Sequence, residues 1–535
     1  MEVRINNDVP IGKRIGKGAY GNVYLHKYSP DTVFKVINVY EKTDCTCGFK
    51  HNPIICSNVL QETTVYHAIN NTSHMVNIKY MIDTSETIVY TMDYAGISLG
   101  KLIKQYDTTR KDTICMIKEI VSSVSRCMID VSDKFIINGD IKPDNIMIQH
   151  NKVLLTDWSL AKIATLPTTK IQSVLQTLWY RAPERIMNTH LETLNTDVWS
   201  LGIIMLELLL DMPGIMSGHD EKDVLRKMAY LFGEESFQCY SDVISVEYKN
   251  IINGNISRFS MYFNIIKKSM TTKEFKMASD LIQKMLEFDP NKRATFIDVY
   301  NHEFFGNTPI KPKSLLDKLD NLQYIAISHV DIMKNHDIRE KRKHNYELII
   351  KLCNACFNST ETELISSVLK ITDIVVGKIL LDKTSWSRYV IYAFDVVCGV
   401  YSFNRPYICE MIQDFDTNYD GTSKYISSAI CEYNNMCREL KYNINANTGI
   451  CYVRLLEESN TEDMTLYRET YLAIQKSFCG LSRTDRSIAR IAMYAVKSVK
   501  NINNEQINEF IGNLTYHETI IARKFLNIAK LNLIK

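Results

Sequence analysis

Residues 136–145 read IINGDIKPDN and place three different polar groups between two apolar stretches. Asp140 supplies a carboxylate, Lys142 a cation two positions later, and Asn145 an amide that can bind a metal ion. Transfer of a phosphoryl group needs a carboxylate to align the attacking hydroxyl, metal ligands, and a cation near the moving group. The spacing therefore predicts these three roles for Asp140, Lys142 and Asn145, in that order.

A second carboxylate suited to a metal ion follows a predicted pair of short strands in NIMIQHNKVLLTD. It is Asp157, in the tripeptide TDW. Because carboxylate and amide oxygens are the ligands that Mg²⁺ prefers, Asp157 is the expected second magnesium ligand beside Asn145.

The segment GKGAYGNV lies between two predicted strands. Its glycines, Gly16, Gly18 and Gly21, would let the backbone approach the phosphates of a nucleotide without a side-chain clash. A three-glycine motif on its own fits a tight hairpin equally well.

A lysine on the next strand strengthens the nucleotide interpretation. The sequence VFKVI places Lys35 between apolar residues, where a charge must be paired or buried at a cost. Glu62, in the helical pattern LQETTVYHAI, is the available partner, and such a pair orients a lysine toward α- and β-phosphates. Taken alone, Lys35 or Glu62 is better explained as a solvated surface charge than as part of a nucleotide site. The ordered set of glycines, lysine and glutamate is not.

The composition bounds the class of protein. The 535 residues are 45% apolar and 23% charged with a net charge of +2, which predicts a globular protein of two or three domains. Nothing in this balance indicates nucleic acid or membrane as a partner. We see no signal peptide or membrane span, and the 14 scattered cysteines indicate mostly reduced thiols, so we expect a cytoplasmic or nuclear location.

Three further motifs follow in order: TLWYRAPE at 177–184, TDVWSLG at 196–202 and DPNKRAT at 289–295. With them, residues 1–306 resemble a eukaryotic-type protein kinase, and TLWYRAPE is most similar to the cyclin-dependent kinase group. The resemblance implies ATP and Mg²⁺ as cofactors and protein substrates. Lys142, two residues after the catalytic aspartate, indicates serine or threonine as the acceptor.

The resemblance also implies an architecture. We expect an α+β kinase fold with a strand-rich small lobe at about 1–92, a hinge at 93–96 and a helical large lobe at 97–306. Further nucleotide contacts are implied for four residues, Ile15, Val23, Asp93 and Ala95. It implies, too, that Glu184 pairs with Arg293 and that Asp197 braces the backbone of the catalytic loop.

Two triplets depart from the family pattern. Asn138-Gly139-Asp140 stands where the family usually has His-Arg-Asp, and Asp157-Trp158-Ser159 where it usually has Asp-Phe-Gly. Neither change removes a group that touches phosphate, metal or hydroxyl, so we expect an active enzyme. The alternative is a catalytically impaired pseudokinase that acts as a binding scaffold.

The arginines that grip an activating phosphothreonine in the relatives are also missing. The matching positions hold Gln61, Gly139 and Lys162, and the phosphothreonine position itself holds Gln172. A phosphate needs such a cluster of cations to order a loop. We therefore expect activity that does not depend on phosphorylation at that site, although Thr168, Thr169 and Ser173 lie nearby.

The rest of the chain predicts a second domain. Two prolines mark a linker at 307–320, and residues 321–535 are a run of helical patterns that resembles a cyclin. Such a domain would activate the kinase in cis. It would contact the helix segment at 56–62, with Leu60 as the apolar anchor. An unrelated all-helical fold is the alternative. Cyclins usually pair a lysine with a glutamate, but here Val400 stands at the position of the lysine, and Glu432 lies one residue away from the position of the glutamate. Large DNA viruses carry diverged kinases of this group and are a conceivable source.

A cysteine-rich insertion precedes the helix of Glu62. Cys45, Cys47, His51 and Cys56 provide the ligand types of a tetrahedral zinc site, although the Cys-x-Cys spacing is tight for one. Reduced surface cysteines are the alternative.

Overall fold

The structure, a computed structural model, describes most of the chain. The described residues are 3–5, 9–17, 21–40, 54–84, 86–105, 113–150, 152–164, 177–187, 193–267, 270–322, 336–357, 362–379, 386–401, 407–442, 444, 456, 462–477, 485–500, 502, 504–514, 518–519, 522 and 526. Among the described helices, none is long and apolar enough to cross a membrane.

The chain forms two compact units. The first comprises the described residues of Met1–Ile37, Val65–Ala164 and Lys170–Pro312. The second includes those of Asn38–Thr64 and Lys313–Lys535. The division falls inside helix α1 (Ser57–Ile69), so the first half of that helix belongs to the same unit as the C-terminal helices.

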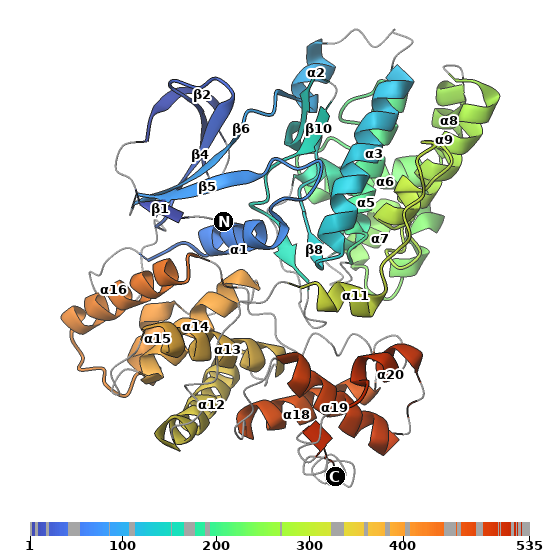
Figure 1. Ribbon diagram of the computed structural model, residues 1–535. Helices are drawn as coiled ribbons and strands as arrows, with labels where there is room; N and C mark the ends of the chain where they lie inside the picture. Colours follow the sequence, from blue (N-terminus) through green and yellow to red (C-terminus); the bar gives the residue numbers. More distant parts are fainter. Residues whose placement is uncertain are drawn as a thin grey trace. The chain divides into compact units, whose positions relative to one another are not determined.

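A six-stranded sheet forms the small lobe of the first unit, in the order β1-β5-β6-β4-β3-β2 (Figure 1). Its strands are β1 (Val3–Ile5), β2 (Ile11–Lys17), β3 (Asn22–His26), β4 (Thr32–Asn38), β5 (Ile78–Asp83) and β6 (Thr87–Asp93). The apolar residues that alternate along three strands form a core cluster of Phe34, Ile82 and Val89. The strand-rich small lobe expected from the sequence is confirmed, and it includes β1, which pairs in parallel with β5.

Short strands hold the catalytic loop. β8 (Ile136–Ile137) pairs with β11 (Lys162–Ile163), while β9 (Ile146–Gln149) lies between β7 (Ile97–Ser98) and β10 (Lys152–Leu155). Residues 138–145 therefore leave one small sheet and enter another, ending in the 3₁₀ turn η1 (Pro143–Asn145). The β9–β10 hairpin, predicted from the sequence, delivers Asp157 just beyond its second strand.

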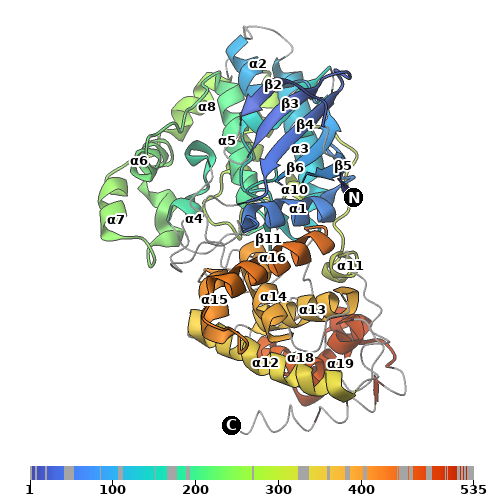
Figure 2. The same ribbon diagram turned by 90° about the vertical axis from the view of Figure 1, so that its left-hand side faces the viewer.

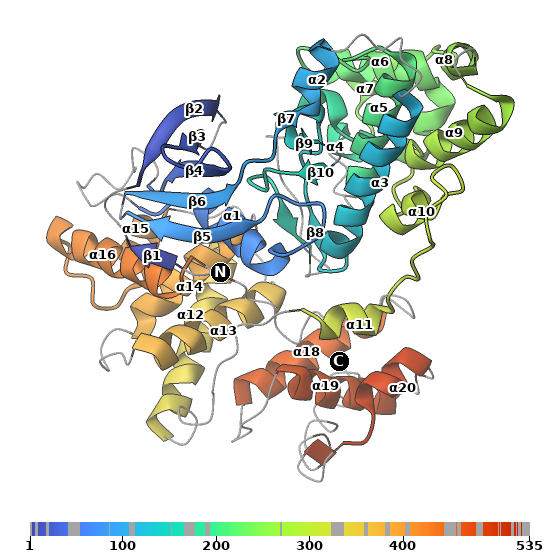
Figure 3. The same cartoon turned by 45° about the horizontal axis from the view of Figure 1, so that its top comes forward.

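Helices form the large lobe (Figure 3). They are α2 (Leu99–Gln105), α3 (Thr113–Ser132), η2 (Leu178–Tyr180), α4 (Pro183–Ile186), α5 (Thr196–Leu210), α6 (Glu221–Phe232), η3 (Glu234–Tyr240), α7 (Val246–Ile252), α8 (Phe259–Lys267), α9 (Thr272–Met285) and α10 (Phe296–Tyr300). Every residue of α5 is buried, as expected for a helix that is apolar on all sides. This helix is the centre of the lobe and carries Asp197 in its first turn.

The C-terminal part of the second unit is helical throughout the residues described. Its helices are α11 (Leu315–Asp320), α12 (His336–Phe357), α13 (Thr362–Ile379), α14 (Trp386–Val400), α15 (Ile408–Phe415), α16 (Ser423–Glu439), α18 (Glu462–Ser477), α19 (Asp485–Lys500) and α20 (Glu505–Ile511). The almost wholly buried α14 contacts α12, α13, α15 and α16, which surround it in Figure 2. These helices agree with the run of helical patterns expected over 321–535, whereas α11 lies within the range expected to be linker.

Candidate active site

The backbone of the catalytic loop explains the unusual Asn138-Gly139-Asp140. Gly139 has a φ of +78°, in the left-handed region where glycine carries no Cβ penalty. The carboxylate of Asp197 accepts hydrogen bonds from the backbone N–H groups of Asn138 (2.6 Å) and Gly139 (3.0 Å), as the family resemblance implied. Glycine therefore allows the peptide to turn at this point without strain while α5 holds it.

Asn138 connects the two halves of the site. Its side-chain oxygen accepts from the backbone N–H of Asp140 at 3.0 Å, and its side-chain nitrogen donates to the backbone carbonyl of Asp157 at 3.4 Å. The side chain is fully buried. The amide thus links the predicted catalytic aspartate to the second predicted metal ligand.

The structure brings Asp140, Lys142 and Asn145 together. Asp140 is buried, and its Oδ2 lies 2.6 Å from Lys142 Nζ and 3.1 Å from Asn145 Nδ2. Thr177 completes the cluster, because its Oγ1 lies 2.8 Å from Lys142 Nζ and its backbone N–H donates to Asp140 Oδ1 at 3.2 Å. Sequence reasoning missed this role of Thr177, which depends on the chain returning to the loop.

Lys35 and Asp157 form the other half of the site. Lys35 Nζ lies 2.9 Å from Asp157 Oδ1. Burial by itself would raise the pKa of Asp157, but the Lys35 ammonium and hydrogen bonds from Lys35 and Ser159 lower it to about 2. Asp157 therefore stays ionised at neutral pH, as a metal-binding carboxylate must.

These side chains fit the chemistry of Mg²⁺. Asp157 offers an ionised carboxylate beside β10, and Asn145 uses its side-chain nitrogen on Asp140, so its oxygen is the atom suited to a metal. Oxygen ligands from one or two side chains, completed by water and phosphate, are typical of magnesium in nucleotide sites. The donor set therefore fits Mg²⁺, and Asn145 and Asp157 as its ligands stay a prediction.

The other predicted nucleotide residues lie on the small-lobe strands and the hinge. Ile15 and Gly16 are on β2 and Val23 on β3, with Gly16 opposite Val23. A Cβ on Gly21 would come within 2.6 Å of the Val36 carbonyl, so only glycine fits there. Asp93 ends β6, and Ala95 follows it in a buried position. Gly18 lies outside the described residues, and the nucleotide contacts stay a prediction.

Glu62 and the zinc ligands are less fully tested. Glu62 is buried on α1, and its pairing with Lys35 stays a prediction. Of the four predicted zinc ligands, Cys56 is described and half-buried, whereas Cys45, Cys47 and His51 lie outside the described residues. Within the described part of the chain, no group of three or more His, Cys, Asp or Glu side chains is placed to hold a metal ion.

A buried ion pair fixes residues 177–187, which are called the activation segment here. Both nitrogens of the Arg293 guanidinium contact the Glu184 carboxylate, at 2.8 and 2.9 Å, and neither side chain is exposed to solvent. This two-bond geometry confirms the pair that the family resemblance implied and holds α4 in place. In the same segment, Arg181 pairs with Glu221 at 2.5 Å.

Glu207 is a buried carboxylate beneath the same segment. Its Oε2 accepts from the Tyr180 hydroxyl at 3.1 Å, and its Oε1 accepts from the backbone N–H groups of Gly214 (2.8 Å) and Ile215 (3.1 Å). Burial raises its pKa from 4.5 to about 7, against these hydrogen bonds, which lower it. Between those two pH values the native state binds more protons at this site than the unfolded chain does.

We therefore expect stability to fall as pH rises from about 4.5 to 7, by up to about 3 kcal/mol at this residue. Glu207→Gln keeps an oxygen for the two backbone donors and removes the titration. The variant should melt at the same temperature as the wild type or higher at pH 8, and its melting temperature should depend less on pH over this range. Thermal melts of both proteins from pH 5 to 8 measure this, and parallel profiles would contradict it.

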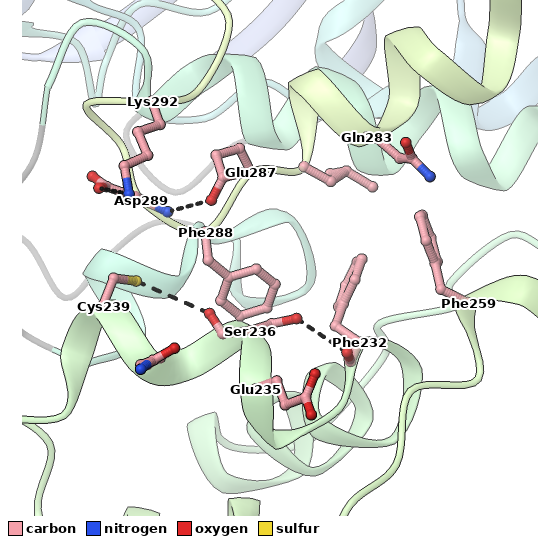
Figure 4. Close-up of a pocket in the computed structure, with 12 residues that line it drawn as sticks. Phe232, Glu235, Ser236, Cys239, Phe259, Gln283, Glu287, Phe288, Asp289 and Lys292 are labelled. Atoms are coloured by element: carbon pink, nitrogen blue, oxygen red, sulfur yellow. Dashed lines mark hydrogen bonds and ion pairs between the residues drawn. The ribbon is translucent and has the colours of Figure 1, made fainter.

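A cavity of about 540 Å³ opens elsewhere in the large lobe (Figure 4). Three aromatic rings, those of Phe232, Phe259 and Phe288, line it together with Cys239 and Asp289. None of the predicted catalytic or nucleotide residues is among the described residues that line it, so it is distinct from the predicted nucleotide site.

The chain is similar to known proteins over the residues that form this site. The family model described as "Protein kinase domain" matches residues 10–305. Among curated proteins, the chain is similar to "Serine/threonine-protein kinase PITSLRE" of Drosophila melanogaster, with 28% identity over 235 residues. The match covers 42% of this chain and 24% of the relative, so the chain spans about a quarter of that protein's length.

Proposed function

The chain belongs to the protein kinase family, and from this premise we propose that it is a serine/threonine protein kinase that transfers the γ-phosphoryl group of ATP to protein hydroxyls. The observation that carries the proposal is the hydrogen-bonded cluster of Asp140, Lys142, Asn145 and Thr177, joined through Asn138 to the Lys35–Asp157 pair. It contains a carboxylate, two cations and two oxygen ligands for a metal, which are the groups that phosphoryl transfer requires.

Each residue has a proposed step. Asp140 accepts a hydrogen bond from the substrate hydroxyl and orients it for in-line attack, and Lys142 stabilises the charge on the moving phosphoryl group. Lys35, aligned by Glu62, holds the α- and β-phosphates. Asn145 and Asp157 would hold Mg²⁺, which would supply positive charge against the phosphate oxygens. Thr177 keeps Lys142 and Asp140 at their observed separation, because it contacts both.

A turnover assay tests the proposal. Full-length protein, incubated with labelled ATP, magnesium and a generic basic protein substrate, should label serine or threonine and not tyrosine. Its melting temperature should rise when ATP and magnesium are added together. A melting shift without turnover would favour the pseudokinase scaffold, and the absence of both would contradict nucleotide binding altogether.

We further propose that the C-terminal helices are cyclin-like and activate the kinase in cis. Hydrogen bonds within the second unit support this. The side-chain oxygen of Asn434, on α16, accepts from the backbone N–H of Ile55 at 3.2 Å. The hydroxyl of Thr64, on α1, donates to the Tyr442 carbonyl (3.3 Å) and accepts from the Ile444 N–H (2.9 Å). The helix that carries Glu62 is therefore anchored along the half that contains this residue.

Two further features bear on the cyclin-like interpretation. A central helix, α14, surrounded by four others is the packing that a cyclin-like domain requires, and it supports the proposal. The ion pair differs from the one sought in the sequence: Glu432 contacts Arg388, near the start of α14, through two bonds of 2.9 and 2.8 Å. The position of Val400, where a lysine was sought, is buried and apolar.

A further inference from the structure

Arg185 contacts the catalytic loop at Gly139, the position that holds an arginine in the usual family pattern. It lies on α4, directly after Glu184, and is buried. Its Nη1 donates to the backbone carbonyl of Gly139 at 3.1 Å. That carbonyl belongs to the peptide bond joining Gly139 to Asp140, so the contact acts one bond away from the catalytic aspartate.

The space beside Gly139 is filled by this guanidinium. A Cβ added at Gly139 would lie 3.4 Å from Arg185 Nη2, 3.6 Å from Arg185 Nη1 and 3.0 Å from the Leu160 carbonyl. These distances are tight, and a φ of +78° disfavours any side chain there. A glycine at 139 and an arginine at 185 therefore fit one another: the small residue leaves room, and the large one occupies it.

The loop peptide is held from both sides. Arg185 donates to the carbonyl of the peptide that joins Gly139 to Asp140, at 3.1 Å, and the N–H of that peptide, which belongs to Asp140, donates to the side-chain oxygen of Asn138 at 3.0 Å. Asp197 holds the preceding peptide through the N–H of Gly139 at 3.0 Å. Hydrogen bonds that involve a charged group are stronger than neutral ones, and those of Arg185 and Asp197 do. The peptide plane before Asp140 consequently has little freedom to rotate.

We infer that Arg185 is a positioning residue, which fixes the position of Asp140 from helix α4. It takes the place of the catalytic-loop arginine that, in the relatives, grips the activating phosphothreonine. The inference rests on the proposed kinase activity. A cation is present at the catalytic loop without any phosphorylated residue, because α4, held by the Glu184–Arg293 pair, supplies it. Arg185 thereby provides a physical basis for activity without phosphorylation of the loop.

Three full-length variants test the inference. Arg185→Met removes the donor while keeping an extended side chain, and should lower kcat by about 10- to 100-fold with the KM for ATP nearly unchanged. Arg185→Lys retains a charged donor and should recover most of the lost rate. Arg258→Met is the matched control, because Arg258 also donates to backbone carbonyls, of Tyr230 and Ile256, and has no proposed part in catalysis.

Two measurements keep the outcome decisive. Melting temperatures with and without ATP and magnesium show whether Arg185→Met is folded and binds nucleotide as the wild type does. Phosphatase treatment of the wild type should leave its turnover unchanged. The inference is overturned if Arg185→Met turns over as fast as Arg258→Met, if Arg185→Lys is no better than Arg185→Met, or if phosphatase abolishes wild-type activity. A wild type without turnover would instead contradict the proposed function.

Discussion

Asp140→Asn should lower kcat by about 1,000-fold and leave nucleotide binding intact. The side chain is 6% exposed, and its carboxylate receives hydrogen bonds from Lys142, Asn145 and the backbone of Thr177. Asparagine has nearly the same shape, so the loop should keep its fold. It lacks the negative charge that attracts the proton of an acceptor hydroxyl and that balances Lys142.

The measurement is initial-rate phosphorylation at saturating ATP, together with the melting shift produced by ATP and magnesium. The matched control is Asp130→Asn, in which the carboxylate lies at the surface and pairs with Arg126 at 3.4 Å. It should turn over as the wild type does. If Asp140→Asn kept more than a tenth of wild-type activity, Asp140 would not organise the transfer, and the roles assigned to its neighbours would need to be reassigned.

The sequence predicted much of this site because its groups lie close together along the chain. Asp140, Lys142 and Asn145 fall within one loop, and Asp157 follows on the next hairpin, so residue type and spacing were sufficient. Thr177 was missed because it lies 37 residues after Asp140 in the chain, and its contacts with the loop exist only in the folded protein. No local pattern marks a threonine for that role.

Arg185 and Gly139 show a different limit. Their complementarity depends on a backbone angle at 139 and on the packing of α4 against the loop, neither of which spacing reveals. From the sequence alone, the glycine was recognised only as the loss of a family arginine. The structure gives it a reason of its own, a left-handed turn beside a guanidinium supplied from another element.

In the C-terminal helical region, some helices could be predicted from the length and apolar character of their sequence patterns, and others could not. The helices α13 and α14 are long and apolar on average, so their periodicity indicated helices. The helix α15 has only eight residues, whereas α19 is long, has a strong apolar face and was nevertheless missed. The ion-pair partner of Glu432 was expected at the end of α14, whereas its partner in the structure, Arg388, lies near the start of that helix.

Deleting residues 307–535 should lower kcat/KM by at least about 100-fold, because the deletion removes the described C-terminal partners of the residues on both sides of Glu62. The hydroxyl of Thr64 is fully buried and bonded at both ends, to the Tyr442 carbonyl and the Ile444 N–H. Loss of those partners removes both hydrogen bonds, each of which stabilises the fold by about 0.5–1.5 kcal/mol. If Glu62 must be held to align Lys35, the helix that carries it would then sample inactive positions.

A deletion also exposes apolar surface, since Val59 and Leu60 are 1% exposed in the full chain, so a gentler pair of full-length variants is needed. Thr64→Val keeps the side-chain shape and removes the hydroxyl, and it should lower kcat/KM by about 10-fold. Thr64→Ser retains the hydroxyl and should stay within about twofold of wild type, because both hydrogen bonds can still form. Equal rates for Thr64→Val and Thr64→Ser, together with full turnover by the 1–306 fragment, would rule out activation in cis and leave the C-terminal helices with a role in docking or assembly.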